Sequence, residues 1–125
     1  MLRPADAEYL ERTGLEYEVT PEAGLIALVI KAWPLPDGYE PREVDLLVRL
    51  PAGFPDTQPD MYWCDPPVRL AGVGGYPQAA DQFEQHLGRN WQRFSRHLPA
   101  GAWRPGRDSL ESYIALIRSE LARTA

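Results

Sequence analysis

Cys64, Ser95 and His97 are the side chains of this sequence best suited to attack, or to help attack, a carbonyl group. Cys64 is the single cysteine, and a thiolate is both a good nucleophile and a good leaving group. His97 could act as a general base or carry an acyl group for a short time. Ser95 and His97 lack the glycine-flanked spacing of a hydrolase nucleophile, so they do not indicate a serine hydrolase.

Cys64 has two interpretations on sequence grounds. It ends a short apolar stretch, residues 60–64, that predicts a strand, and free cysteines in strands are usually buried and inert. The neighbouring Asp65 carboxylate would also raise the pKa of the thiol. The alternative is that Cys64 is a catalytic nucleophile. His86 and His97 do not combine with Cys64 in a metal-site spacing, so the sequence predicts neither a metal nor another cofactor.

The segment of residues 89–106, RNWQRFSRHLPAGAWRPG, reverses the charge of the rest of the chain. It holds four Arg and no acidic residue, whereas residues 1–60 hold twelve acidic and five basic residues. A guanidinium group can hold a carboxylate through two hydrogen bonds, which favours a binding site for a partner's C-terminal carboxylate. The predicted partner-binding residues are Trp91, Arg93, Ser95, Arg96, His97, Trp103 and Arg104. The alternative is that these arginines pair with the acidic first half of the same fold.

The composition and charge of the chain exclude several classes of protein. The chain has 125 residues, of which 44% are apolar and 25% charged, and its formal net charge is −5. These values fit one globular domain over residues 1–125. The acidic balance argues against bulk nucleic-acid binding, and no apolar run approaches the length of a membrane span. With one cysteine and no secretion signal, we expect a cytoplasmic protein.

The first half of the chain predicts one helix followed by strands. Residues 5–13 form an amphipathic pattern that Gly14 would end. Alternating or continuous apolar patterns then predict strands at residues 15–20, 25–33, 43–50 and 60–64, of which 43–50 is the clearest. Consecutive strands joined by short turns favour an antiparallel meander.

The second half predicts an irregular stretch and a C-terminal helix. Residues 65–77 are rich in Pro and Gly, and residues 79–88 predict a short helix because Phe83 and Leu87 lie four positions apart. Asp108 or Ser109 would cap the last helix. Its apolar stripe, which we expect to pack on the sheet, consists of Leu110, Tyr113, Ile114, Ile117 and Leu121. The predicted fold class is α+β, with helices at both ends of a four-stranded meander.

This order of elements resembles the ubiquitin-conjugating enzyme (UBC) fold. More closely, the chain resembles the small prokaryotic branch of that superfamily called family E. The segments FPDTQPDMYW, WQRFSRH and WRPG carry the resemblance, in that order, and it extends over roughly residues 5 to 122. It implies an N-terminal helix, a four-stranded meander, a long irregular active-site segment and C-terminal helical structure.

The resemblance also implies partners and a chemistry. Conjugating enzymes carry the C-terminus of a ubiquitin-like protein as a thioester on a cysteine that follows the fourth strand and a His-Pro-Asn turn. This chain has neither a His-Pro-Asn turn nor any Cys after Cys64. The implied partners are an activating-enzyme-like protein, a ubiquitin-like protein and a JAB-type peptidase.

Three functions remain open from the sequence. The first, which we favour, is a component of a bacterial conjugation system that recognises or scaffolds the ubiquitin-like protein without conventional thioester catalysis. The second is an active conjugating enzyme that carries the ubiquitin-like protein on Cys64 or His97. The third is a stand-alone protein-interaction domain.

Overall fold

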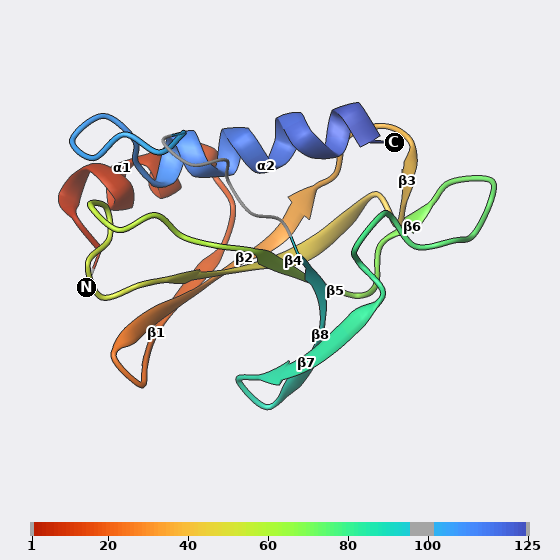
Figure 1. Cartoon of the computed structure of the whole chain (residues 1–125), viewed down its shortest axis with the longest axis horizontal. Coiled ribbons are helices and arrows are strands. Elements are labelled where there is room, and N and C mark those ends of the chain that lie inside the picture. The colour runs from red at the N-terminus through yellow and green to blue at the C-terminus, as the bar shows by residue number, and fades with distance from the viewer. Residues whose placement is uncertain (1, 96–101, 125) are drawn as a thin grey trace.

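A computed structural model describes residues 2–95 and 102–124 of the chain (Figure 1). In these residues the elements follow the order helix, strands, helix. They are α1 (Pro4–Thr13), β1 (Tyr17–Glu22), β2 (Leu25–Pro34), β3 (Tyr39–Glu40), β4 (Glu43–Leu50), β5 (Tyr62–Asp65), β6 (Arg69–Leu70), β7 (Gln82–His86), β8 (Arg89–Phe94) and α2 (Leu110–Thr124). The α+β class predicted from the sequence is confirmed. Neither described helix is both long enough and apolar enough to cross a membrane.

The main sheet contains six of the described strands in the order β1-β2-β4-β5-β8-β7. All of its neighbouring pairs are antiparallel, and β3 and β6 form a separate two-stranded ladder. The expected meander is present as β1-β2-β4-β5. The strand predicted at residues 43–50 is β4, in the interior of the sheet.

Both described helices pack on one face of this sheet. Leu10 of α1 and the predicted apolar stripe of α2 share a buried cluster with Leu28, Leu46 and Val48 of the central strands. Burying an aliphatic side chain of this size contributes about 1.5–3 kcal/mol, so this cluster is the main source of stability. The opposite face carries a smaller buried cluster, made of Ala27, Val29, Leu47, Trp63 and Trp91. We call this second surface the helix-free face.

The two helices are joined at their N-terminal ends. Asp6 is buried, with 2% of its surface exposed, and its carboxylate accepts two hydrogen bonds from the Arg3 guanidinium at 3.0 and 3.1 Å. It also accepts one from the backbone N–H of Leu110, the first residue of α2, at 3.3 Å. An acidic group at a helix N-terminus is favourable because the first N–H groups of a helix lack partners within it. Ser109 and Ser112 add reciprocal capping contacts.

The helix predicted at residues 79–88 is wrong. Residues 82–86 form β7, which pairs with β8 through a two-residue turn at Leu87 and Gly88. Both turn residues have positive φ, 55° and 75°, which is the conformation that this type of hairpin turn requires. The β7–β8 hairpin therefore lies where the resemblance implied an irregular active-site segment, and it extends the sheet beyond the four-stranded meander.

Candidate functional site

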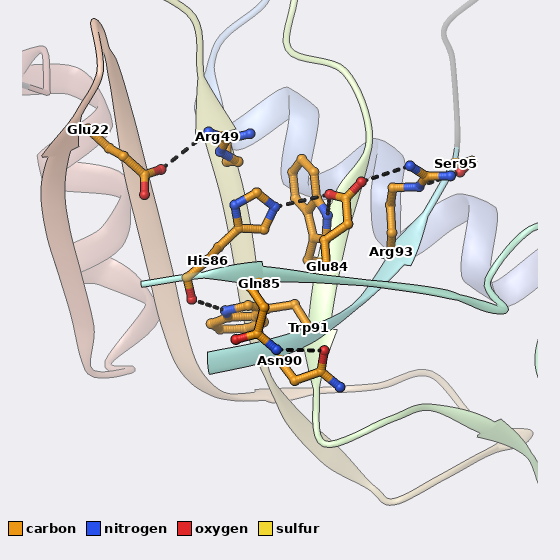
Figure 2. A network of polar contacts seen from close by, with 10 residues as sticks. Glu22, Arg49, Glu84, Gln85, His86, Asn90, Trp91, Arg93 and Ser95 are labelled. Atoms are coloured by element: carbon orange, nitrogen blue, oxygen red, sulfur yellow. Dashed lines mark hydrogen bonds and ion pairs between the residues drawn. The ribbon is translucent and has the colours of Figure 1, made fainter. Parts of the chain in front are cut away.

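The Glu84 carboxylate is the centre of a polar network on the helix-free face (Figure 2). Its Oε1 accepts a hydrogen bond from Trp63 Nε1 at 2.9 Å and lies 3.0 Å from Nε2 of His86. Its Oε2 accepts one from Arg93 Nη1 at 2.7 Å. Three nitrogen groups from three strands therefore converge on one carboxylate.

Hydrogen bonding outweighs burial at Glu84. Partial burial alone would raise the pKa of this carboxyl group, because burial disfavours the charged form. The hydrogen bonds from His86, Trp63 and Arg93 favour the charged form more strongly, so the pKa of Glu84 lies below its ordinary value. The network is therefore built around an ionised carboxylate.

Arg93 connects this network to the residues after β8. Its Nε donates to Ser95 Oγ at 3.0 Å while its Nη1 is bound to Glu84. The backbone N–H of Ser95 donates to the carbonyl of Ala79 at 3.0 Å, which fixes the end of β8. With 29% of its side chain exposed, Arg93 remains accessible to solvent. Arg93 and Ser95, both predicted binding residues, are thus in contact.

Two indole rings form the base of the site. Trp91 donates from Nε1 to the carbonyl of His86 at 2.9 Å, and the Arg89 guanidinium lies 4.4 Å from the centre of its ring. The Trp63 ring contacts the His86 ring edge to face at 5.3 Å between centroids. The Arg49 guanidinium lies 5.7 Å from the Trp63 ring. These buried rings hold the polar side chains above them in fixed positions.

Arg89 is held by acidic residues of two other strands. Its Nη2 lies 2.6 Å from Oδ2 of Asp65 and 2.9 Å from Oδ2 of Asp45. Arg93 is likewise paired, with Glu84. Arg89 therefore pairs with the acidic first half of the chain through Asp45, as the alternative expects. Asp65, its second partner, and Glu84, the partner of Arg93, lie outside that half. Of the predicted binding residues, Arg93 contacts Ser95, while Arg89 contacts the ring of Trp91.

Cys64 lies in the helix-side core. Its side chain is 0% exposed and belongs to the cluster beneath α1 and α2. Burial raises the pKa of the thiol, and the negative charge of Asp65 raises it further. A buried thiol that resists ionisation is a poor nucleophile. These surroundings are those of a core residue, which favours the interpretation of Cys64 as inert.

The remaining predicted residues do not join Arg93. Trp103 donates from Nε1 to the carbonyl of Pro55 at 2.8 Å and lies in the helix-side cluster. Arg104 is exposed, and its backbone N–H donates to Asp108 Oδ2 at 2.6 Å in the turn before α2. Arg96 and His97 lie outside the described residues.

Trp91 and Trp103, both predicted as partner-binding residues, are buried. Trp91 is 0% exposed and Trp103 is 9% exposed. Each large apolar ring is more stable packed against a sheet than in water, and each indole N–H has found a carbonyl partner. Both rings support the surrounding structure, and their part in partner binding stays a prediction.

Sequence reasoning missed Glu84 and Gln92 and placed His86 within the helix predicted at residues 79–88. Gln92 is 1% exposed on the helix side of β8, where its amide binds the backbone of Val68 and the carbonyl of Ala80. The sequence signal that could have revealed these residues is the alternation of side-chain types on both sides of Leu87 and Gly88. This alternation is typical of a β-hairpin.

A pocket of about 490 Å³ opens elsewhere on the molecule. It lies where the start of α1, the β1–β2 turn and the segment after β4 meet. Leu25, Ile26 and Phe54 contribute apolar surface, and Arg3 and Glu22 contribute charge. No residue predicted for the site lines this pocket. Among the described ranges, no group of three or more His, Cys, Asp or Glu side chains is arranged to hold a metal ion.

Comparison with known proteins gives one match. The family model described as prokaryotic E2 family E matches residues 2–124. No curated protein and no solved structure matches the chain.

Proposed function

The chain belongs to prokaryotic E2 family E, a UBC-like family, and from this premise we propose that it recognises a ubiquitin-like protein without carrying it as a thioester. Family membership connects the chain to ubiquitin-like modification machinery. The finer proposal concerns its task in that machinery. Its task is to hold or present the ubiquitin-like protein. An activating-enzyme-like partner activates that protein, and a JAB-type peptidase removes it.

The observation that carries this proposal is the position of Cys64. Thioester formation needs an accessible thiolate, whereas Cys64 is fully buried beneath two helices and its thiol pKa is raised. Exposing it would require opening the main core, which would cost much of the stability of a small domain. Covalent transfer through Cys64 is therefore disfavoured on physical grounds.

The binding residues proposed for the ubiquitin-like protein centre on Arg93 and Ser95. Arg93 is a partly exposed guanidinium that Glu84 holds in place, and such preorganisation lowers the entropy lost on binding. Arg96 and His97 remain predicted members of the same surface, and Arg104 remains a predicted binding residue in the turn before α2. These hydrogen-bond donors are best suited to bind a carboxylate.

A mixture of the chain with its activating-enzyme-like protein, the ubiquitin-like protein and ATP tests the proposal. We expect no reductant-sensitive adduct, and we expect the ubiquitin-like protein to bind in a titration. Arg93→Ala should weaken that binding about tenfold, because a hydrogen bond to a charged group contributes roughly that much. Arg42→Ala removes an exposed arginine that pairs with Asp37 and is the matched control.

The alternative functions have distinct outcomes in the same experiment. A reductant-sensitive adduct that Cys64→Ser abolishes would establish thioester catalysis and overturn the proposal. An adduct that survives Cys64→Ser and disappears in His97→Ala would assign the acyl carrier to His97. Absence of both adduct and binding would leave a stand-alone interaction domain.

A further inference from the structure

The outer edge of β7 ends the main sheet. In the sheet order β7 is terminal, and in residues 2–95 and 102–124 its paired neighbour is β8 alone. We propose that this edge receives the C-terminal tail of the ubiquitin-like protein as an added antiparallel strand, with the terminal carboxylate at Arg93. This inference rests on the proposed function and specifies how the partner is held.

The two edges of the sheet differ in how they are protected. At the opposite edge, β1 contains Pro21, which has no N–H to donate, and carries the carboxylates of Glu18 and Glu22. Proline and charge are common means of blocking strand addition at an edge. The residues of β7 are Gln82, Phe83, Glu84, Gln85 and His86, without proline. The carboxylates do not distinguish the two edges, because Glu18 and Glu22 are paired with Lys31 and Arg49. The proline does, so β7 is the edge left open to strand addition.

The hairpin turn indicates which backbone groups of β7 face outward. In an antiparallel ladder, alternate residues direct their N–H and C=O groups toward the neighbouring strand and away from it. His86 and Arg89 flank the two-residue turn and are the closing pair of the ladder. Counting back by alternation, Phe83 and Gln85 direct their backbone groups toward the open edge. An extended peptide could bind both residues through its main chain, whatever its side chains.

Antiparallel addition determines where the carboxylate lies. A strand antiparallel to β7 ends beside Gln82, which is paired with Arg93 in the sheet. The Arg93 guanidinium does not stay above β8, because its Nη1 reaches Glu84 on β7 at 2.7 Å. An added strand would lie about 4.8 Å beyond β7, within reach of this group. A guanidinium carries five donors, so it can bind a second carboxylate while keeping Glu84 and Ser95.

Phe83 supplies an apolar contact on the helix side of the same edge. Its ring is 37% exposed and packs edge to face on Tyr76, with 5.9 Å between centroids. The Arg69 guanidinium lies over the Tyr76 ring, 4.6 Å from the centre of that ring. Alternate side chains of an added strand would rest on Phe83, so one apolar residue near the end of the tail would add affinity.

A second copy of this chain fits the edge less well than a tail. Two β7 strands paired about their central residue would place two Glu84 side chains directly opposite each other, and like charges in that position are destabilising. A partner tail brings its terminal carboxylate to Arg93 instead. Charge complementarity thus selects the tail as the occupant.

The test uses a synthetic peptide with the last eight residues of the ubiquitin-like protein, titrated into the intact chain by calorimetry. We expect saturable binding, and about a tenfold loss when the terminal carboxylate is replaced by an amide. Arg93→Ala should cause a similar loss for the acid peptide and little further loss for the amide, because both changes remove the same contact. Arg42→Ala should leave all these affinities unchanged.

Peptides carrying one N-methyl group at successive positions test strand addition directly. Methylation should abolish binding at alternate positions and be tolerated between them, because only every second amide would face β7. Uniform tolerance, or losses without alternation, would overturn the inference. If the whole ubiquitin-like protein binds in an Arg93-dependent way and the tail peptide does not, the inference fails while the proposed function stands. Dimerisation of the chain at micromolar concentration that Phe83→Pro abolishes would instead assign the edge to a second copy.

Discussion

Trp63 and Cys64 are consecutive residues of β5 whose side chains lie on opposite faces of the sheet. Trp63 Nε1 binds Glu84 on the helix-free face, while Cys64 is buried in the helix-side cluster. Because Trp63 pairs directly with Arg93, that guanidinium is also on the helix-free face. The thiol and the guanidinium are therefore separated by the sheet itself, and they cannot act on one carboxyl group in this conformation.

The buried thiol should make stability fall at alkaline pH. The pKa of Cys64 is raised from its ordinary 9.0, so the unfolded chain loses this proton at a pH where the folded chain keeps it. Stability is therefore full below about pH 9 and declines above it. Between about pH 9 and 10 the wild-type chain should lose about 1 kcal/mol more of its unfolding free energy than Cys64→Ala.

Urea titrations at several pH values would measure this difference. The pKa values of Tyr9, Tyr17 and Tyr113 are also raised, but from an ordinary 10.0, so their effect begins at higher pH. The interval below pH 10 thus isolates the thiol. Equal losses for the wild type and Cys64→Ala would contradict the burial of this group.

Much of the fold could be predicted because its strongest signals are local. The alternation in residues 43–50 identified β4, and the stripe that includes Tyr113 and Ile117 identified α2. The hairpin was missed because Phe83 and Leu87 have helical spacing, while Leu87 adopts a positive φ that its residue type does not suggest. At Leu87 the local sequence pattern therefore disagrees with the conformation of the backbone.

The site could be predicted only in part, because its contacts link strands that are distant in the sequence. The charge and shape of Arg93 marked it as a binding residue, and its neighbour Ser95 is beside it in the structure. Nothing in the sequence pairs Glu84 with Trp63, 21 positions earlier. That contact depends on the register of β5, β8 and β7, which follows from the unpredicted hairpin.

Gln92 should be essential for the stability of the packing between β8 and the segment that joins β5 to β7. Gln92→Leu keeps the approximate volume but leaves the N–H and C=O of Val68 and the C=O of Ala80 without this partner. Each unsatisfied buried group costs about 1–3 kcal/mol, so we expect a loss of roughly 3 kcal/mol in unfolding free energy. Urea denaturation measures it. Gln58→Leu, at an exposed position, should change stability by less than about 0.5 kcal/mol.

The turn of the hairpin depends on Gly88. Its φ is +75° and a Cβ atom there would meet no heavy atom within 4 Å, so Gly88→Ala tests backbone conformation without a steric clash. The left-handed conformation costs a non-glycine residue about 1–2 kcal/mol. We expect that loss in thermal or urea unfolding, with earlier amide exchange in β7. Gly75→Ala is the matched control, since its φ is not positive and its Cβ is also unobstructed. A similar loss in both variants would argue against the turn geometry.

Glu84→Gln should remove an acid-sensitive contribution to stability. The pKa of Glu84 is lowered, so its ionised form stabilises the folded state above its ordinary value of 4.5, and this stabilisation is lost as the pH falls through the lower, folded-state pKa. We expect the wild-type chain to lose about 1 kcal/mol more than the variant on acidification. Trp63 fluorescence should shift over the same pH range in the wild type alone, because its indole N–H donates to this carboxylate.

Glu43→Gln separates this effect from the general loss of negative charge on acidification. Glu43 is exposed on β4, so its replacement changes the net charge by the same amount without touching the network. The Glu43 variant should keep the acid sensitivity and the fluorescence shift of the wild type. If Glu84→Gln also kept both, the carboxylate would not be the centre of the network. Arg93 would then be positioned by other contacts, and the tail-binding geometry at β7 would need a different anchor.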